Sequence, residues 1–137
     1  MVKRTVHING WMVYFYFAID TYYQDEIIDQ LKMLGANRSI IKKTLKNMDP
    51  NVRNNGFTFT NQDKKTSLVC IGKTSNGSEF LNTVFHELRH LSDDICSYYG
   101  KSTNGEAVAY TLGDIMQNLS DIICTYSCDR CRKKIGI

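Results

Sequence analysis

Long apolar segments are missing from this sequence. A helix needs roughly 20 continuous apolar residues to cross a bilayer, and no window of the chain approaches that length. Near the start, basic residues precede an apolar run, but Tyr14, Tyr16 and Asp20 interrupt that run and no small-residue cleavage site follows. We therefore expect no membrane span, no export signal and no membrane partner, and we expect a cytoplasmic protein.

An excess of one charge sign is also missing. With 17 Lys and Arg against 14 Asp and Glu, the formal net charge is +3, far from the charge density of a dedicated nucleic-acid binder. The five cysteines are odd in number, and their spacing does not resemble the dense framework of a small secreted protein. We therefore expect reduced thiols and no nucleic-acid partner, while the oligomeric state has no signature in the sequence.

The length and the hydrophobic content allow one compact core. A chain of 137 residues with 42% hydrophobic content is too short for two comfortable domains. We predict a single domain over residues 1–137, with a Cys-rich basic tail at about 124–137.

Two hairpins and two helices are predicted in the first half of the chain. Asn9-Gly10, a dipeptide that tolerates positive φ, separates two segments rich in β-branched and aromatic residues. Two further strand patterns flank a polar loop at 61–65. Helical spacing of apolar residues, stopped by Gly35 or by Asp49-Pro50, indicates the helices. The predicted strands are 6–8, 11–19, 56–60 and 66–72, and the predicted helices are 22–34 and 39–48.

A longer amphipathic helix is predicted over about 78–97, with Asn76 or Ser78 available as its cap. Its predicted apolar stripe consists of Leu81, Val84, Phe85, Leu88 and Ile95. The helix carries the segment HELRH. Residues four apart on a helix lie one above the other, so His86 and His90 can turn their imidazoles towards one shared zinc ion. Glu87 lies about 100° around the helix, where its carboxylate can reach a metal-bound water without binding the metal. We interpret Glu87 as the candidate general base.

The alternative is a chance pattern on a helix surface, because a five-residue motif always carries false positives. Two observations oppose chance: the motif uses two of the three histidines in the chain, and it lies on a well-formed amphipathic helix. We expect the third histidine, His7, to be an ordinary strand residue.

A catalytic zinc takes three protein ligands and keeps one position open for water, so a third residue is needed. Asp93 and Cys96 occupy positions where a metzincin would continue with Gly and His, which argues against that class. Glu106 opens the next predicted helix and is the third-ligand candidate. It lies away from the buried stripe predicted for that helix, which consists of Val108, Leu112, Ile115, Leu119 and Ile122. Glu106 has a second interpretation, because Thr103-x-x-Glu106 fits a capping box at the start of that helix.

These residues resemble the gluzincin zinc peptidases, in which HExxH is followed by a glutamate on the next helix. The segment GEAVAY, residues 105–110, also resembles the glutamate-bearing segment of small peptidase-like proteins of phages and mobile elements. The resemblance covers roughly residues 66–120. It differs from several gluzincins in holding Tyr110, and not an aspartate, four residues after Glu106.

The resemblance implies a minimal zincin-like α+β fold, with a small antiparallel or mixed sheet packed on the motif helix and on the Glu106 helix. It also implies that the strand 66–72 is a sheet edge able to pair with an extended substrate, and we weigh this equally with a core strand. Three residues are candidates to support the site by orienting its ligands: Asp93, Tyr110 and Asp114. For each aspartate, an ordinary surface acid is the alternative interpretation, and the one that we favour.

The predicted activity is zinc-dependent hydrolysis of a peptide or protein. Zinc lowers the pKa of its water to about 7, and Glu87 would take the proton during attack on the peptide carbonyl and return it to the departing amine. Two rival functions remain: a non-catalytic zinc-binding regulatory or host-interaction module on the same fold, and a DNA-associated factor that uses the basic tail.

The tail holds three closely spaced thiols, at Cys124, Cys128 and Cys131. They could bind a second, structural zinc ion if Cys96 or Cys70 completed the site, since a closed zinc site takes four ligands. The interpretation that we favour is reduced or incidentally paired thiols.

Overall fold

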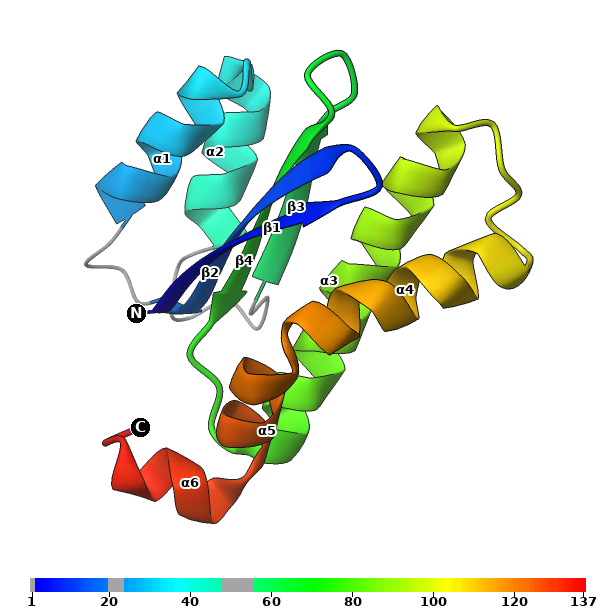
Figure 1. Ribbon diagram of the computed structural model, residues 1–137. Helices are drawn as coiled ribbons and strands as arrows, with labels where there is room; N and C mark the ends of the chain where they lie inside the picture. Colours follow the sequence, from blue (N-terminus) through cyan, green and yellow to red (C-terminus); the bar gives the residue numbers. More distant parts are fainter. Residues whose placement is uncertain (1, 20–23, 48–55) are drawn as a thin grey trace. The chain divides into compact units, whose positions relative to one another are not determined.

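The computed structural model describes residues 2–19, 24–47 and 56–137. In these residues the chain forms four strands and six helices, and the predicted α+β class with a small mixed sheet is confirmed (Figure 1). The chain divides into two compact units, Met1–Lys73 and Thr74–Ile137. The single domain and the packing of the sheet on the motif helix stay predictions.

The first unit contains all four strands of the sheet together with two helices. In chain order its elements are β1 (Val2–Ile8), β2 (Trp11–Ile19), α1 (Gln24–Met33), α2 (Arg38–Asn47), β3 (Gly56–Asn61) and β4 (Thr66–Gly72). The turn between β1 and β2 is the predicted one, with positive φ at Asn9 (51°) and Gly10 (76°). His7 lies in β1, as expected of an ordinary strand residue.

The sheet has the order β1-β2-β4-β3, and this order corrects one prediction. β4 pairs in parallel with β2 and antiparallel with β3, so the strand 66–72 has a neighbour on each side and is not a sheet edge. Its side chains from Thr66 to Ile71 are buried. The core-strand interpretation is therefore right, and β4 cannot pair with a substrate because its backbone groups are already used within the sheet.

The core of the first unit lies between the sheet and α1. Ile27, Leu31 and Leu34 pack with side chains from β2 and β4, including Tyr16 and Leu68. α1 ends before Gly35, whose φ of +83° is the left-handed conformation that glycine adopts readily at a helix end. The predicted helical residues 22, 23 and 48, and the break at Asp49-Pro50, lie outside the described residues.

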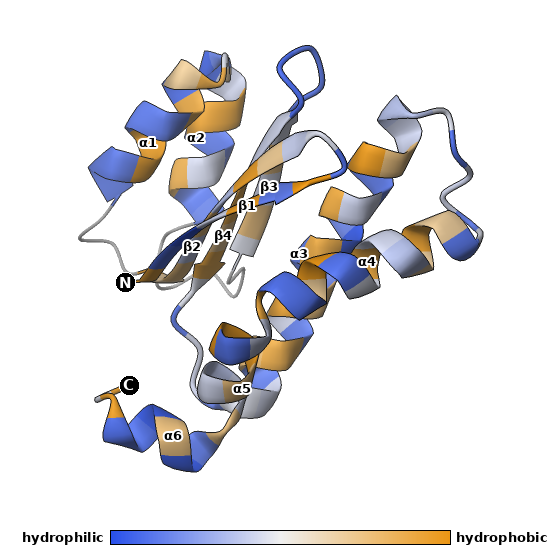
Figure 2. Ribbon diagram, in the orientation of Figure 1, coloured by the Kyte–Doolittle hydropathy of each residue, from blue (hydrophilic) through white to orange (hydrophobic). Residues whose placement is uncertain are grey.

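The second unit is helical, and its elements are α3 (Gly77–Tyr98), α4 (Glu106–Asn118), α5 (Ser120–Ser127) and α6 (Asp129–Lys134). α3 packs against α4 and α5. Figure 2 shows apolar and polar residues alternating along α3, as expected of an amphipathic helix. Within its predicted apolar stripe, Val84, Leu88 and Ile95 are buried, whereas Phe85 is 43% exposed.

The apolar stripe predicted for one helix from Val108 to Ile122 is shared by two helices. α4 ends at Asn118, with Leu119 as its C-cap, and α5 begins one residue later. Val108, Ile115, Leu119 and Ile122 are buried as predicted, whereas Leu112 of the same stripe is only half-buried. None of the helices in the described part of the chain combines the length and apolar character needed to cross a membrane.

Candidate metal centre

The imidazoles of His86 and His90 converge on the surface of α3. Their Nε2 atoms are within hydrogen-bonding distance, 3.1 Å apart, and the ring planes are inclined at 79° with centroids 4.7 Å apart. Both residues are exposed. The helix places them one turn apart on one face, as the four-residue spacing predicts.

Glu87 differs from the two histidines of the motif because it is buried, with only 4% of its surface exposed. An ordinary surface glutamate would be exposed, because glutamate is rarely buried unless its carboxylate is paired. Glu87 is therefore not one of the solvent-exposed acids of the helix surface.

The arrangement of the two nitrogens fits a zinc ion. With Zn–N bonds of about 2.0–2.1 Å, two ligands of a tetrahedral ion lie roughly 3.3 Å apart. The observed 3.1 Å between the Nε2 atoms is close to that separation. The described residues contain no group of three or more His, Cys, Asp or Glu side chains arranged to hold a metal ion, so the structure brings His86 and His90 together but does not bring Glu106 into a group with them.

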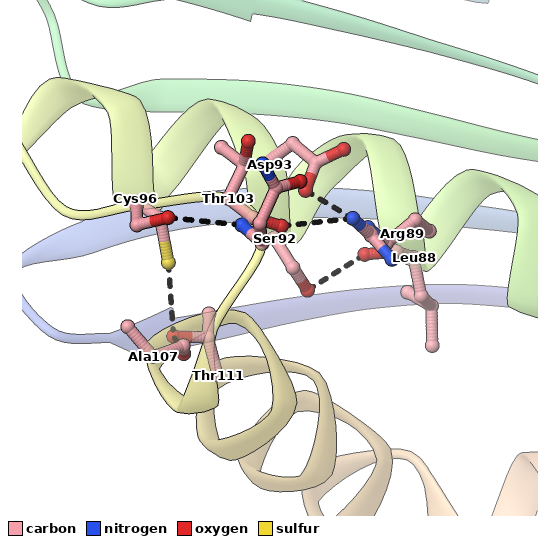
Figure 3. Close-up of polar contacts among 10 residues, drawn as sticks. Leu88, Arg89, Ser92, Asp93, Cys96, Thr103, Ala107 and Thr111 are labelled. Atoms are coloured by element: carbon pink, nitrogen blue, oxygen red, sulfur yellow. Dashed lines mark hydrogen bonds and ion pairs between the residues drawn. The ribbon is translucent and has the colours of Figure 1, made fainter.

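Arg89 ties the motif helix to the loop that leads into α4. Its Nη2 donates to the carbonyl oxygen of Thr103 at 2.9 Å, and its Nε donates to Asp93 Oδ1 at 2.9 Å (Figure 3). Sequence reasoning missed this residue, although an Arg-x-x-x-Asp spacing on a helix favours such a pair. Asp93 therefore bonds to Arg89, whereas the sequence offered it either as a residue that orients an imidazole or as an ordinary surface acid.

Polar contacts also join α3 to α4 next to this loop. Cys96 Sγ lies 3.6 Å from Thr111 Oγ1, which in turn donates to the carbonyl oxygen of Ala107 (Figure 3). The amide of Lys101 donates to the carbonyl oxygen of Cys96 at 2.9 Å. Both ends of the loop between the helices are thus held by hydrogen bonds.

Glu106 is the first residue of α4 and is exposed. The N-cap of this helix is Gly105, which has no side chain to donate or accept a capping hydrogen bond. The capping box from Thr103 to Glu106 is therefore wrong, because it requires Thr103 in the N-cap position. Tyr110 is 70% exposed, and Asp114 is exposed on the same helix.

The cysteines of the tail lie on two helices. Cys124 is on α5, Cys128 is the N-cap of α6, and Cys131 lies in the first turn of α6. All five cysteines of the chain are free thiols. Arg132, counted in the sequence as part of a basic tail, is 4% exposed and bonds to backbone carbonyls, so it is not available on the surface.

Comparisons of this chain with protein-family models, with curated proteins and with solved structures gave no significant match.

Proposed function

We propose that this protein is a cytoplasmic zinc-dependent peptidase of the gluzincin type. The observation that carries the proposal is the convergence of His86 Nε2 and His90 Nε2 to 3.1 Å on one exposed helix face. That separation suits two ligands of one tetrahedral zinc ion. The substrate would be a peptide or a protein.

In this proposal Glu106 supplies the third ligand. Its position is supported by the hydrogen bond from Arg89 to the carbonyl oxygen of Thr103, because Arg89 directly precedes His90 and Thr103 lies three residues before Glu106. The loop into α4 is thereby tied to the same turn of α3 that carries His90. Glu106 is also free of a capping role, since Gly105 is the N-cap of α4.

Zinc, when bound, supplies a Lewis acid and a water whose pKa falls to about 7. Glu87 would be the general base: its carboxylate would take one proton from the attacking water and return it to the amine that leaves when the peptide bond breaks. The role rests on the position of Glu87 in α3, directly after His86 and about one turn before His90.

Zinc content tests the proposed ligands. The parent chain, purified without chelator, is expected to hold one zinc ion, and His86→Ala and His90→Ala are each expected to lose it. Glu106→Gln should weaken zinc binding at least about tenfold, since it replaces an anionic ligand. His7→Ala is the matched control because it removes the remaining histidine, which is exposed on β1, and it should keep the metal.

Metal analysis measures the zinc content of each protein, and competition with a chelator measures its affinity for zinc. Parent protein without zinc, or loss of zinc in His7→Ala to the same extent as in His86→Ala, would contradict the proposed site. Zinc retained by the parent but no hydrolysis of any peptide in a library would favour the regulatory or host-interaction module on the same fold.

A further inference from the structure

Two cysteines of the tail lie on one helical turn. Cys128 is the N-cap of α6 and Cys131 is the third residue of that helix. The amide of Arg132 donates to the carbonyl oxygen of Cys128 at 2.9 Å, which closes the first turn. Residues three apart on such a turn have α-carbons about 5 Å apart, within the range that a disulfide spans.

The Cys128 side chain already contacts the backbone of Cys131 across this turn. The backbone amide of Cys131 donates to Cys128 Sγ at 3.4 Å. Both residues are partly accessible, so a small reagent in solution can reach them, and Cys124 on α5 is exposed. The disulfide geometry therefore needs little rearrangement of the backbone.

The turn is held in place by contacts within the second unit. The buried guanidinium of Arg132 donates to the carbonyl oxygens of Tyr126, at 3.0 Å, and of Thr74. Asp129 Oδ1 accepts from the amide of Gly77 at 2.8 Å. Because residues on both sides of Cys131 are anchored, Cys128 and Cys131 keep their mutual position.

The two thiols also differ in acidity. The hydrogen bond from the Cys131 amide, followed by a side-chain hydrogen bond with Cys131, lowers the pKa of Cys128. The side-chain hydrogen bond with Cys128, followed by burial, raises the pKa of Cys131. Since the thiolate is the nucleophile, Cys128 would attack an oxidant first and Cys131 would act second.

We propose that Cys128 and Cys131 form a reversible dithiol–disulfide pair whose reaction partners are low-molecular-weight disulfides. This proposal is independent of the metal centre. A structural metal site that uses the tail cysteines is the competing assignment, and the zinc measurement in the test below separates the two.

The reaction balances with a disulfide as the oxidant. The Cys128 thiolate attacks one sulfur of the small disulfide, forms a mixed disulfide and releases one small thiolate. Cys131 loses its proton to water and attacks Cys128 Sγ, which forms the intramolecular disulfide and releases the second small thiolate. The two protein thiols are oxidised, and the small disulfide is reduced to two thiols. An excess of small thiol reverses both steps.

The test uses the full chain, reduced, freed of reductant and exposed without oxygen to glutathione disulfide. Remaining thiols are alkylated, and the protein is digested with trypsin and analysed by mass. Trypsin cuts after Arg130, which lies between Cys128 and Cys131, whereas no Lys or Arg lies between Cys124 and Cys128. A Cys128–Cys131 disulfide therefore joins two peptides, and a Cys124–Cys128 disulfide stays within one.

We expect the joined peptides in the parent and, to the same extent, in Cys124→Ser, which is the matched control. Cys131→Ser should stop at the mixed disulfide on Cys128, and added glutathione should restore free thiols in the parent. Loss of the joined peptides in Cys124→Ser would overturn the proposal, as would five alkylated cysteines in the oxidised parent. Zinc bound by the reduced parent and lost in Cys124→Ser would also overturn it, in favour of a metal site.

Discussion

His86, Glu87 and His90 share two turns of α3 but differ in exposure. The two histidines are exposed with their Nε2 atoms 3.1 Å apart, and Glu87 is buried. The spacing in the sequence was enough to predict that the imidazoles meet on one face, because helical periodicity fixes that face. Burial of Glu87 was not predictable in this way, since it depends on which elements pack around the helix.

The contact of Arg89 with Thr103 and the position of Glu106 in its helix could not be predicted from the sequence. The capping box assigned to Thr103 and Glu106 fails because the helix begins later than that motif requires, at Glu106 itself. The hydrogen bond from Arg89 to the Thr103 carbonyl joins residues of two different segments, and no local pattern encodes it.

Gly77 gives a prediction at the scale of one residue. A Cβ atom at this position would lie 1.9 Å from the carbonyl oxygen of Ser127, and backbone cannot yield as a flexible side chain can. Gly77→Ala should therefore destabilise the protein by about 1–3 kcal/mol through overpacking. Gly113→Ala is the control: nothing lies within 4 Å of its added Cβ, and alanine in a helix should stabilise by up to about 1 kcal/mol.

Urea unfolding of the two glycine variants measures both changes. A Gly77→Ala protein as stable as the parent would contradict the close approach of the start of α3 to the end of α5.

At the scale of elements, the strands and helices were largely predictable and their neighbours were not. The bounds of β4 match the predicted 66–72, because its β-branched and apolar residues are flanked by clear turn signals. Its central place in the sheet comes from parallel pairing with β2, a contact between distant segments that hydropathy patterns do not report. The break between α4 and α5 was missed because the apolar spacing continues across Leu119.

The start of α3 gives a prediction at this scale. The sequence offered Asn76 or Ser78 as the cap, and the structure shows Asn76 Oδ1 accepting from the amide of Glu79 at 2.9 Å. Asn76→Ala should lower the free energy of unfolding by about 1 kcal/mol, because the amide loses its acceptor. Ser78→Ala, two residues along, should change it by less than about 0.5 kcal/mol.

Chemical denaturation of these two variants against the parent provides the measurement. Equal losses in both, or a larger loss in Ser78→Ala, would contradict Asn76 as the cap.

At the scale of the whole molecule, the proposed site belongs to one unit. His86, Glu87, His90 and Glu106 all lie within Thr74–Ile137, as do the three cysteines of the tail. The mixed sheet belongs to Met1–Lys73. The sequence therefore predicted the two helices that carry the candidate site. It did not predict the substrate, because the spacing of residues does not encode the shape of a binding surface.

Turnover by Glu87→Gln at equal zinc content tests the proposed peptidase activity most directly. The parent and the variant are loaded with zinc, their metal content is matched, and each is incubated with one peptide library analysed by mass. The proposal predicts cleavage by the parent and a rate about 10²–10⁴-fold lower in Glu87→Gln, because only the general base is removed. Equal rates in the two proteins, or no cleavage by the zinc-loaded parent, would contradict it.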